Sequence, residues 1–261
     1  MSTTTLAAPI PVNTAGVHAR PRLGRLVAVE LRKAVDTRAG FWLQVAMVGL
    51  TAVVVVVRLL VGDAADHTFQ HVLDAGLQPA AALLPVLGIL LVTSEWSQRT
   101  GLITFALVPA RSRILGAKLV ASLLLAVAML AMSVAIVAVG VLVSSPGVEG
   151  TWSYAVPLIG QSAVNLTAVM VVGVALGALL LAPAPAIVLL FALPTSLMAV
   201  LSLPAFSGID QWVDYARNLG QMTPDVISAT QWAQTATSLV IWMVLPLLIG
   251  TWRLTRREVT V

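Results

Sequence analysis

The chain lacks cysteine altogether and is poor in charged residues. Without cysteine it forms neither a disulfide nor a thiolate metal site, so cysteine gives no information about its compartment. Charged residues make up only 10% of its 261 residues and hydrophobic residues 59%, whereas soluble domains carry about 25% charged residues. This composition excludes an ordinary soluble domain and indicates a membrane protein.

Groups for catalysis or ion coupling are scarce in the apolar parts of the sequence. None of the three histidines lies in an apolar run, and no Asp or Glu lies deep in one. An intramembrane enzyme needs concentrated catalytic groups, and a proton- or sodium-driven carrier needs buried carboxylates. We therefore expect no catalytic residue and no enzymatic activity in this chain.

His67 and His71 are spaced like metal ligands, at positions i and i+4 among acidic neighbours. The sequence places no third ligand beside them, so we expect a solvated outer loop and no metal site. The phosphate-binding motif G-x-x-x-x-G-K-[ST] is also missing. ATP, if it is used, must therefore be held by another chain.

What the sequence does contain is long apolar stretches. A helix needs about 20 residues to cross roughly 30 Å of hydrocarbon. The second stretch begins as early as Leu73, and its prolines need not end it, because neighbouring helices can satisfy the freed carbonyl groups. The predicted spans are Phe41–Val61, Pro79–Thr93, Leu119–Val143, Pro157–Leu181, Ala186–Leu203 and Thr235–Trp252. The predicted fold class is an all-α membrane protein with six transmembrane helices.

Most basic residues lie in connecting segments that are separated by an even number of spans. Such segments lie on the same side of the membrane. All but two of the 15 Lys and Arg residues lie before the first span, after the second or after the sixth. The exceptions, Arg58 and Arg217, accompany the segments that hold most of the acidic residues. Because cytoplasmic loops are enriched in Lys and Arg, both termini are predicted to be cytoplasmic.

Four parts are predicted along the chain. Residues 1–21 have no apolar core long enough for a signal peptide and are expected to be a disordered cytoplasmic tail. Residues 22–40 carry apolar side chains at helical spacing with basic side chains opposite, which predicts an amphipathic helix at the membrane interface. The six-span domain occupies 41–252, and a basic cytoplasmic tail occupies 253–261.

The segment that follows the second span, "SEWSQRTGLITFALVPARSRILGAK" at 94–118, interrupts the apolar sequence. Within it, Leu102–Val108 is apolar on nearly every side, lies between arginines and ends at Pro109. A helix that is apolar all round must be covered all round. Lipid covers one face, and docking in a groove of a cytoplasmic protein covers the rest. The alternative is an interfacial helix that only reverses the chain.

This segment resembles the region between the second and third spans in permeases of ATP-binding-cassette transporters of the type-two exporter class. In that family an acidic residue ends the second span, a short coupling helix follows, and a pattern of Leu, Pro, Ser-Arg and Lys leads into the third. The matching residues are Glu95, Gly101, Thr104, Leu107, Pro109, Ser112, Arg113 and Lys118. The basic helix before the first span, the six crossings and the long outer connection before the last span are similar as well.

The resemblance implies the permease subunit of an exporter in the bacterial plasma (inner) membrane. Such a subunit pairs with a second permease copy or homologue and docks cytoplasmic ATP-binding-cassette ATPases, which hold the ATP and magnesium. It binds no cofactor itself and no nucleic acid. The residues implied in ATPase docking are Glu95, Arg99, Leu102, Ile103, Phe105, Leu107, Pro109, Arg111 and Arg113.

One departure from the family is the connection "APAP" at 182–185, which is uncharged and too short for a second docking element. A secondary transporter or channel-like protein without an ATPase partner is the alternative function.

Polar and flexible side chains within the spans are candidates for a substrate path. Polar groups at this depth face protein or a water-filled cavity, and methionine adapts to irregular pockets. Hydrogen bonds between helices and ordinary core packing explain the same residues equally well. The candidates are Gln44, Thr51, Gln161, Asn165, Met129 and Met132.

Gly173 and Gly177 form a G-x-x-x-G pattern in the fourth span, a spacing that lets two helix backbones approach closely. The pattern forms either an interface with a second permease or a contact between helices of this chain. Six helices offer more contacts within the chain than one interface does. The segment 205–230 is too polar to cross a membrane. Trp212 and Tyr215 predict a short helix on the outer surface, which in the resembling family caps the exit.

Overall fold

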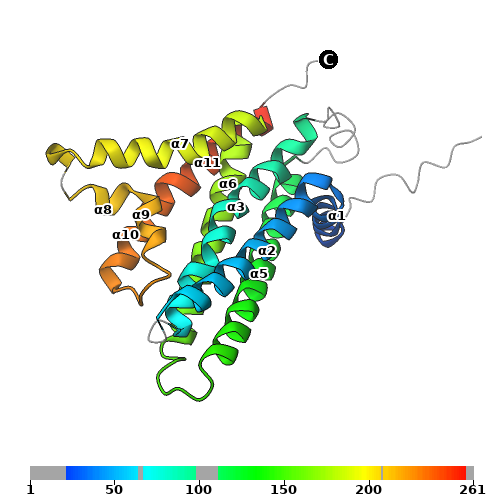
Figure 1. The fold of residues 1–261 in the computed structure, drawn as a ribbon. Helices are drawn as coiled ribbons and strands as arrows, with labels where there is room; N and C mark the ends of the chain where they lie inside the picture. Colours follow the sequence, from blue (N-terminus) through cyan, green and yellow to red (C-terminus); the bar gives the residue numbers. More distant parts are fainter. Residues whose placement is uncertain (1–21, 64–66, 98–110, 207, 257–261) are drawn as a thin grey trace, which may run out of the picture.

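The computed structural model describes residues 22–63, 67–97, 111–206 and 208–256 (Figure 1). Every regular element in these ranges is a helix. In chain order the helices are α1 (Leu23–Asp36), α2 (Arg38–Val61), α3 (Phe69–Ser97), α5 (Arg111–Ser144), α6 (Ala155–Leu180), α7 (Pro183–Leu201), η3 (Pro204–Phe206), α8 (Asp210–Val213), α9 (Tyr215–Gly220), α10 (Ala229–Leu239), η4 (Val240–Val244) and α11 (Leu245–Arg256).

Six of these stretches are long and apolar enough to cross a membrane: α2, α3, α5, α6, α7 and the run from α10 through η4 to α11. They coincide with the predicted spans, which confirms an all-helical protein with the pattern of a multi-pass membrane protein. Both Pro79 and Pro85 lie inside α3, so neither proline ends the helix. At the other end of the chain α11 continues to Arg256, beyond the predicted end of the sixth span at Trp252.

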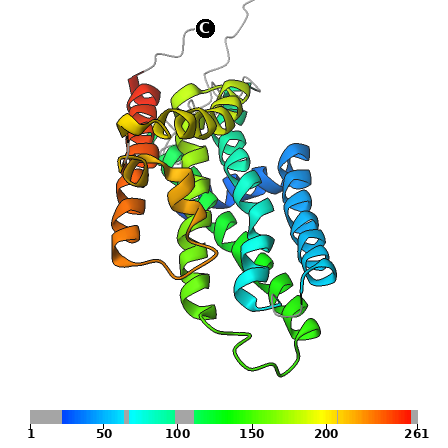
Figure 2. The same ribbon diagram turned by 60° about the vertical axis from the view of Figure 1, so that its left-hand side comes forward.

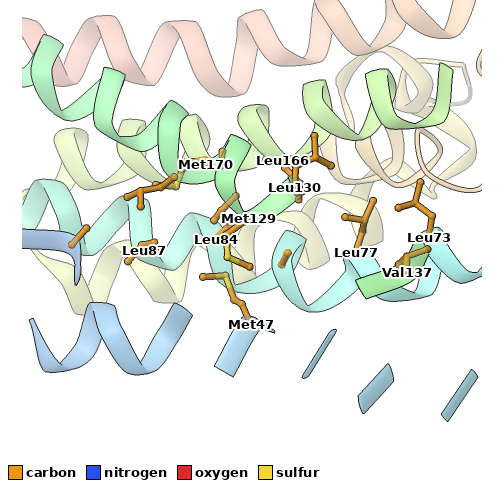
Figure 3. Close-up of a cluster of buried hydrophobic side chains, with 14 of the residues drawn as sticks. Met47, Leu73, Leu77, Leu84, Leu87, Met129, Leu130, Val137, Leu166 and Met170 are labelled. Carbon is orange, nitrogen blue, oxygen red and sulfur yellow. The ribbon is translucent and has the colours of Figure 1, made fainter. Parts of the chain in front are cut away.

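Helices α2, α3, α5 and α6 form a bundle, and their side chains meet in a continuous apolar core (Figures 1 and 3). Met47 of α2, Leu84 of α3, Met129 of α5 and Met170 of α6 are all buried there. Burial differs strongly among spans of similar hydropathy, with 67% of the apolar window of α6 buried but only 17% of that of α2. Packing, and not hydropathy, therefore makes α6 a central helix and α2 a peripheral one.

Helices α3 and α6 approach each other closely because glycines of α6 face the α3 backbone. A Cβ atom built on Gly173 would lie 2.0 Å from Pro85 O, and one on Gly177 would lie 3.2 Å from Ile89 Cα. Within this chain the G-x-x-x-G pattern thus serves the contact between α6 and α3, where small residues let backbones pack together.

Substitution of Gly173 by Ala is expected to destabilise the bundle. The added methyl group meets backbone atoms of Pro85 that cannot rotate away, so α3 and α6 must separate, at a cost of about 1–3 kcal/mol. The melting temperature of the purified protein in detergent should fall. Gly160→Ala on the same helix is the control, because a Cβ there meets nothing within 4 Å and Ala favours a helix by about 1 kcal/mol. Equal melting temperatures for the two variants would contradict the close approach.

Helix α7 departs from the direction of the bundle. In both views it runs across α3, α5 and α6 and not alongside them (Figures 1 and 2). Its outer face is exposed at Val188 and Met198. From the far end of α7 the chain returns through α8 and α9 to α10, and the segment from α10 to α11 then runs along the bundle (Figure 2). This course leaves space between α7 and the bundle, which α9 partly fills.

Charged residues separate toward the two ends of the bundle. The basic end contains α1, the end of α3, the start of α5 and the end of α11, joined by contacts that include Arg253 Nη1 donating to Leu179 O at 2.6 Å. The opposite end contains the connections after α2 and α5, with Asp63 and Glu149. Among the described residues, the acidic connections after α2 and α5 therefore lie at the end opposite these basic helix ends, whereas Asp210 and Asp214 lie beside α7.

Candidate functional site

Most of the predicted ATPase-docking residues lie outside the described residues: this holds for Arg99, Leu102, Ile103, Phe105, Leu107 and Pro109. Glu95 belongs to the last turn of α3, Arg111 is the first residue of α5, and Arg113 follows it as a half-buried residue. The coupling helix therefore stays a prediction, while the ends of the two helices that it joins are described.

A buried ion pair links these two helix ends to α1. Lys118 Nζ on α5 lies 2.7 Å from Glu30 Oε2 on α1 and donates a second hydrogen bond to Leu91 O of α3 at 2.8 Å. Lys33 Nζ lies 2.8 Å from the other carboxylate oxygen of Glu30. Glu30 is 4% exposed and Lys118 3% exposed, so both charges lie inside the protein.

The ion pair connects three helices. Desolvation of two charges is costly, and a buried pair persists where its geometry is good and its remaining hydrogen-bonding groups are satisfied. Here the pair joins α1 to α3 at Leu91 and to α5 at Lys118, the two helices that precede and follow the segment 98–110 in the sequence.

Sequence reasoning missed Glu30, because this residue was assigned neither to the apolar nor to the polar side of the predicted helix. The signal that could have identified Glu30 was its position along the helix. Glu30 lies three residues after Val27 and four before Ala34, and all three are buried on one face of α1. A carboxylate on the apolar face of a helix requires a buried partner, and sequence alone does not say that the partner is Lys118.

The polar candidates on α2 bind backbone carbonyl groups between helices. Gln44 Nε2 donates to Ala34 O and to Gly40 O, each at 3.1 Å. Thr51 Oγ1 donates to Gly76 O of α3 at 3.1 Å and is fully buried. These bonds fix α2 against α1 and α3, and neither residue lines the hollow described below.

The two methionine candidates on α5 have different surroundings. Met129 is buried in the central core (Figure 3), whereas Met132 is 48% exposed on the outside of the bundle. Neither lines the hollow.

Gln161 on α6 holds the segment that follows α9. Its Nε2 donates to Met222 O at 2.8 Å and to Asp225 O at 2.7 Å, and its Oε1 accepts from Ile227 N at 3.0 Å. One buried amide thereby satisfies three backbone groups of a stretch without regular structure. The segment between α9 and α10 is thus anchored to the bundle.

The substitution Gln161→Leu is expected to loosen this anchor. Three backbone groups lose their partner, and each buried unsatisfied group costs about 1–3 kcal/mol. In hydrogen–deuterium exchange, the amides of residues 222–227 should exchange about tenfold faster or more. The control is Gln44→Leu, which makes the same chemical change on α2, where Gln44 contacts Ala34 and Gly40. This variant should leave the exchange of residues 222–227 unchanged. Unaltered exchange of residues 222–227 in Gln161→Leu would show that the hydrogen bonds of Gln161 do not stabilise this segment.

Asn165, one turn further along α6, lines a hollow between α3, α6, α7 and α9. The hollow has a volume of about 360 Å³ and mostly apolar walls that include Phe191 and Pro194 of α7. Asn165 Nδ2 donates to Leu219 O of α9 at 2.9 Å. Its Oδ1 is buried and has no hydrogen-bond partner among the described residues, which is uncommon for a buried polar atom. Of the path candidates, Asn165 alone lines the hollow.

A second hollow, of about 590 Å³, adjoins the first and carries charge. It shares Pro194, Thr195 and Ala216 with the first hollow, and its lining also includes Asp210, Asp214 and Arg217. Its two carboxylates and one guanidinium leave one excess negative charge. This acidic hollow thus continues the apolar one toward α8.

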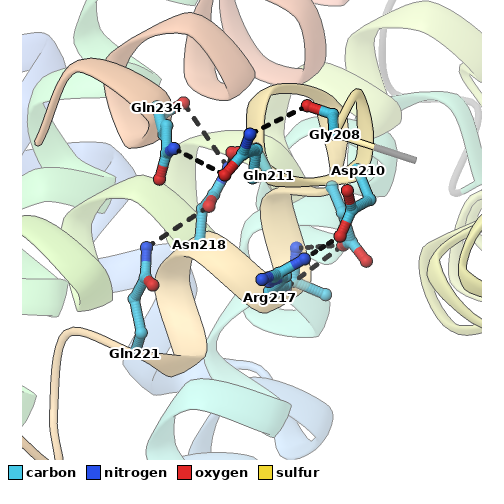
Figure 4. A network of polar contacts seen from close by, with 9 residues as sticks. Gly208, Asp210, Gln211, Arg217, Asn218, Gln221 and Gln234 are labelled. Atoms are coloured by element: carbon cyan, nitrogen blue, oxygen red, sulfur yellow. Dashed lines mark hydrogen bonds and ion pairs between the residues drawn. The ribbon is translucent and has the colours of Figure 1, made fainter. Parts of the chain in front are cut away.

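The three charged side chains are held by local contacts. Arg217 forms an ion pair with Asp210 (Figure 4). Asp214 is 6% exposed and begins α9 as its N-cap, because its Oδ1 accepts from Ala216 N at 3.0 Å and from Arg217 N at 3.1 Å. Its negative charge therefore has a fixed position at the wall.

Tyr215 lines the apolar hollow beside Asp214. Burial, and then the negative charge of Asp214, raise the pKa of Tyr215 from 10.0 to about 12. Its ring contacts Trp242, with centroids 5.8 Å apart, and Trp242 Nε1 donates to Val213 O at 2.7 Å. Trp242 lies in η4, a π-helical turn, a rare conformation that is frequent at functional sites.

Amide side chains hold α8, α9 and α10 together on the other side of α9 (Figure 4). Asn218 Nδ2 donates to Gln211 O at 3.0 Å, Gln221 Nε2 donates to Asn218 Oδ1 at 3.3 Å, and Gln234 Nε2 donates to Gln211 Oε1 at 3.2 Å. Tyr215, Asn218 and Leu219 are buried. Helix α9 therefore packs into the molecule, where sequence predicted a helix resting on the surface, whereas α8 has no buried residue.

Comparison with known proteins gives no assignment. No model of a known protein family matches the chain, and no curated protein sequence matches it significantly. The function must therefore be inferred from the residues and their arrangement.

Proposed function

We propose that this chain is the membrane-spanning permease subunit of an ATP-driven exporter of the ATP-binding-cassette type, coupled to a separate cytoplasmic ATPase. The observation that carries the proposal is the segment between α3 and α5. Its sequence resembles the coupling region of such permeases, and Lys118 ties the helices on both sides of it to α1 through Glu30 and Leu91. A chain that receives force from a partner at this point needs such a connection.

The charge distribution supports the orientation that the proposal requires. Arg32, Lys33, Arg38 and Arg113 lie at the end of the bundle that adjoins the segment 98–110. By the positive-inside rule this end is cytoplasmic, where an ATPase has access to ATP. In this arrangement both termini face the cytoplasm of a bacterial cell and the protein resides in its plasma membrane.

Close packing supplies a route from the docking segment to the hollow. Leu91 O of α3 accepts a hydrogen bond from Lys118 of α5, and Pro85 and Ile89 of α3 lie against Gly173 and Gly177 of α6. Pro85 also lines the hollow. Because packed helices move as rigid bodies, a displacement of the end of α3 changes the separation of the hollow's walls. We propose that this change alternates the access of a substrate to the hollow.

A second permease copy or homologue completes the proposed assembly. Large apolar side chains are exposed on α2, such as Val53 and Leu60, and on α7, such as Val188 and Phe191. Lipid and a second permease are the surroundings that satisfy such faces in a membrane.

Purification of the tagged full-length chain from its native membranes in mild detergent tests the proposal. We expect a cytoplasmic ATPase with a phosphate-binding loop to co-purify in a fixed ratio, and its ATP hydrolysis rate to change when the permease is added. Purification of the chain alone, or with a partner that lacks a nucleotide-binding site, would contradict the proposal.

A further inference from the structure

The apolar hollow contains a hydrogen-bond acceptor without a partner. Three of the donors that line it are used within the protein: Thr195 Oγ1 donates to Phe191 O, Thr223 Oγ1 to Asp74 Oδ1, and Asn165 Nδ2 to Leu219 O. Asn165 Oδ1, by contrast, is buried without a partner among the described residues. A ligand group that pairs with this oxygen must donate a hydrogen bond to it.

Two prolines add acceptors to opposite walls. Pro85 of α3 and Pro194 of α7 lie inside their helices, and proline has no N–H to offer the carbonyl group four residues earlier. Those carbonyl groups belong to Ala81 and Leu190, and both residues line the apolar hollow together with the prolines. Each of these two carbonyl groups therefore lacks its usual donor within the helix.

The charges around the hollows set a second requirement for a ligand. The neighbouring hollow contains Asp210 and Asp214 but a single cation, Arg217, which is paired with Asp210. Burial is the larger cause of the raised pKa of Tyr215, and the negative charge of Asp214 is the smaller one. Burial disfavours a charge of either sign, whereas the charge of Asp214 disfavours an anion and favours a cation.

We propose that the two hollows bind one amphipathic cation, with an apolar body against α3, α6 and α7 and a cationic group whose N–H donates a hydrogen bond. Asn165 Oδ1 is the buried acceptor, and Asp214 balances the charge. As a binding site the proposal stands on this arrangement alone. As the substrate site of an exporter it rests on the proposed function.

Binding of a fluorescent dye to the full-length protein in phosphatidylcholine nanodiscs tests the proposal. The probe is rhodamine 6G, an apolar cation with N–H donors, and sulforhodamine 101, an anionic dye with a similar ring system, is the matched comparison. Fluorescence anisotropy, corrected with empty nanodiscs, should show saturable binding of the cation and none of the anion. Absence of saturable rhodamine binding, or equal affinity for both dyes, would overturn the proposal.

A pair of variants separates the acceptor from the structural role of Asn165. Asn165→Leu and Asn165→Asp both lose the Nδ2 donor to Leu219 O, but only Asp keeps an acceptor at Oδ1. We expect rhodamine affinity to fall about tenfold or more in the Leu variant and to be retained or increased in the Asp variant. If both variants bind alike, whether normally or not at all, the unpaired oxygen does not hold the ligand and the proposal is wrong.

Asp214→Asn removes the charge and keeps the helix cap, because Asn is an equally good N-cap residue. Rhodamine affinity should fall severalfold in this variant with an unchanged melting temperature, and unchanged affinity would remove Asp214 from the site. The assay contains no ATPase. Loss of ATPase co-purification with retained dye binding would therefore reject only the exporter function, and the reverse result would reject only the ligand.

Discussion

Replacement of Phe105 or Leu107 by Asp is expected to abolish association with the ATPase while the protein remains inserted in the membrane. If Leu102–Val108 docks in a groove of the partner, either substitution places a carboxylate in an apolar contact without a counter-charge. Burial of an unpaired charge costs several kcal/mol, which corresponds to a loss of affinity of about a hundredfold or more. The measurement is the molar ratio of ATPase to tagged permease after purification in detergent.

Conservative variants serve as controls for this experiment. Phe105→Leu and Leu107→Met keep apolar side chains of similar size and should retain the partner near the wild-type ratio. Membrane fractionation and a single peak in size-exclusion chromatography confirm that the Asp variants are folded. Retention of the partner by both Asp variants would mean that this segment only reverses the chain.

Substitution of Lys118 by Met is expected to cause a large loss of stability. Among the described residues Glu30 then keeps Lys33, which is half-exposed, and Leu91 O loses the bond from Lys118 but keeps the one from Ser94 Oγ at 3.3 Å. Removal of one partner of a buried ion pair costs about 3–5 kcal/mol. At about 2–4 °C per kcal/mol for a chain of this size, the melting temperature in detergent should fall by about 6–20 °C.

Lys33→Met is the matched control, because it makes the same chemical change in the other cation that contacts Glu30. Its side chain is 37% exposed, and ion pairs at exposed positions contribute about 0–1 kcal/mol. The double variant Glu30→Met/Lys118→Met should recover part of the lost stability, since replacing both charges leaves no buried charge unpaired. A Lys118→Met protein that melts like Lys33→Met would show that the pair contributes no more than a surface contact.

The ion pair also shows where sequence reasoning reached its limit. The amphipathic segment 22–40 was predicted to be helical, and α1 occupies most of it. Its apolar stripe was expected to face lipid, yet Val27, Glu30 and Ala34 are buried against the bundle. Periodicity identifies the face of a helix that avoids water. It does not distinguish lipid from protein as the cover.

Asn165 and Gln161 illustrate the same limit within a span. Both are polar residues one turn apart on α6, and sequence treats them as equivalent candidates for a substrate path. The structure separates them, because Gln161 has three backbone partners, while Asn165 lines the hollow and its buried Oδ1 has no partner among the described residues. Their partners come from the segment after α7, whose course no local pattern predicts.

The sequence by itself determined the membrane class, the six apolar helices and the separation of basic from acidic segments. These properties depend on composition and on hydropathy over about 20 neighbouring residues, so they can be read locally. Only the tertiary structure decided that α6 is central and α2 peripheral, that α7 crosses the bundle, that Glu30 meets Lys118 over a separation of 88 residues, and that Asn165 meets Leu219 over 54. When a span is apolar on every side, its hydropathy does not favour one packing arrangement over another. The arrangement is therefore set by glycine contacts and a few buried polar groups, whose partners lie far away in the sequence.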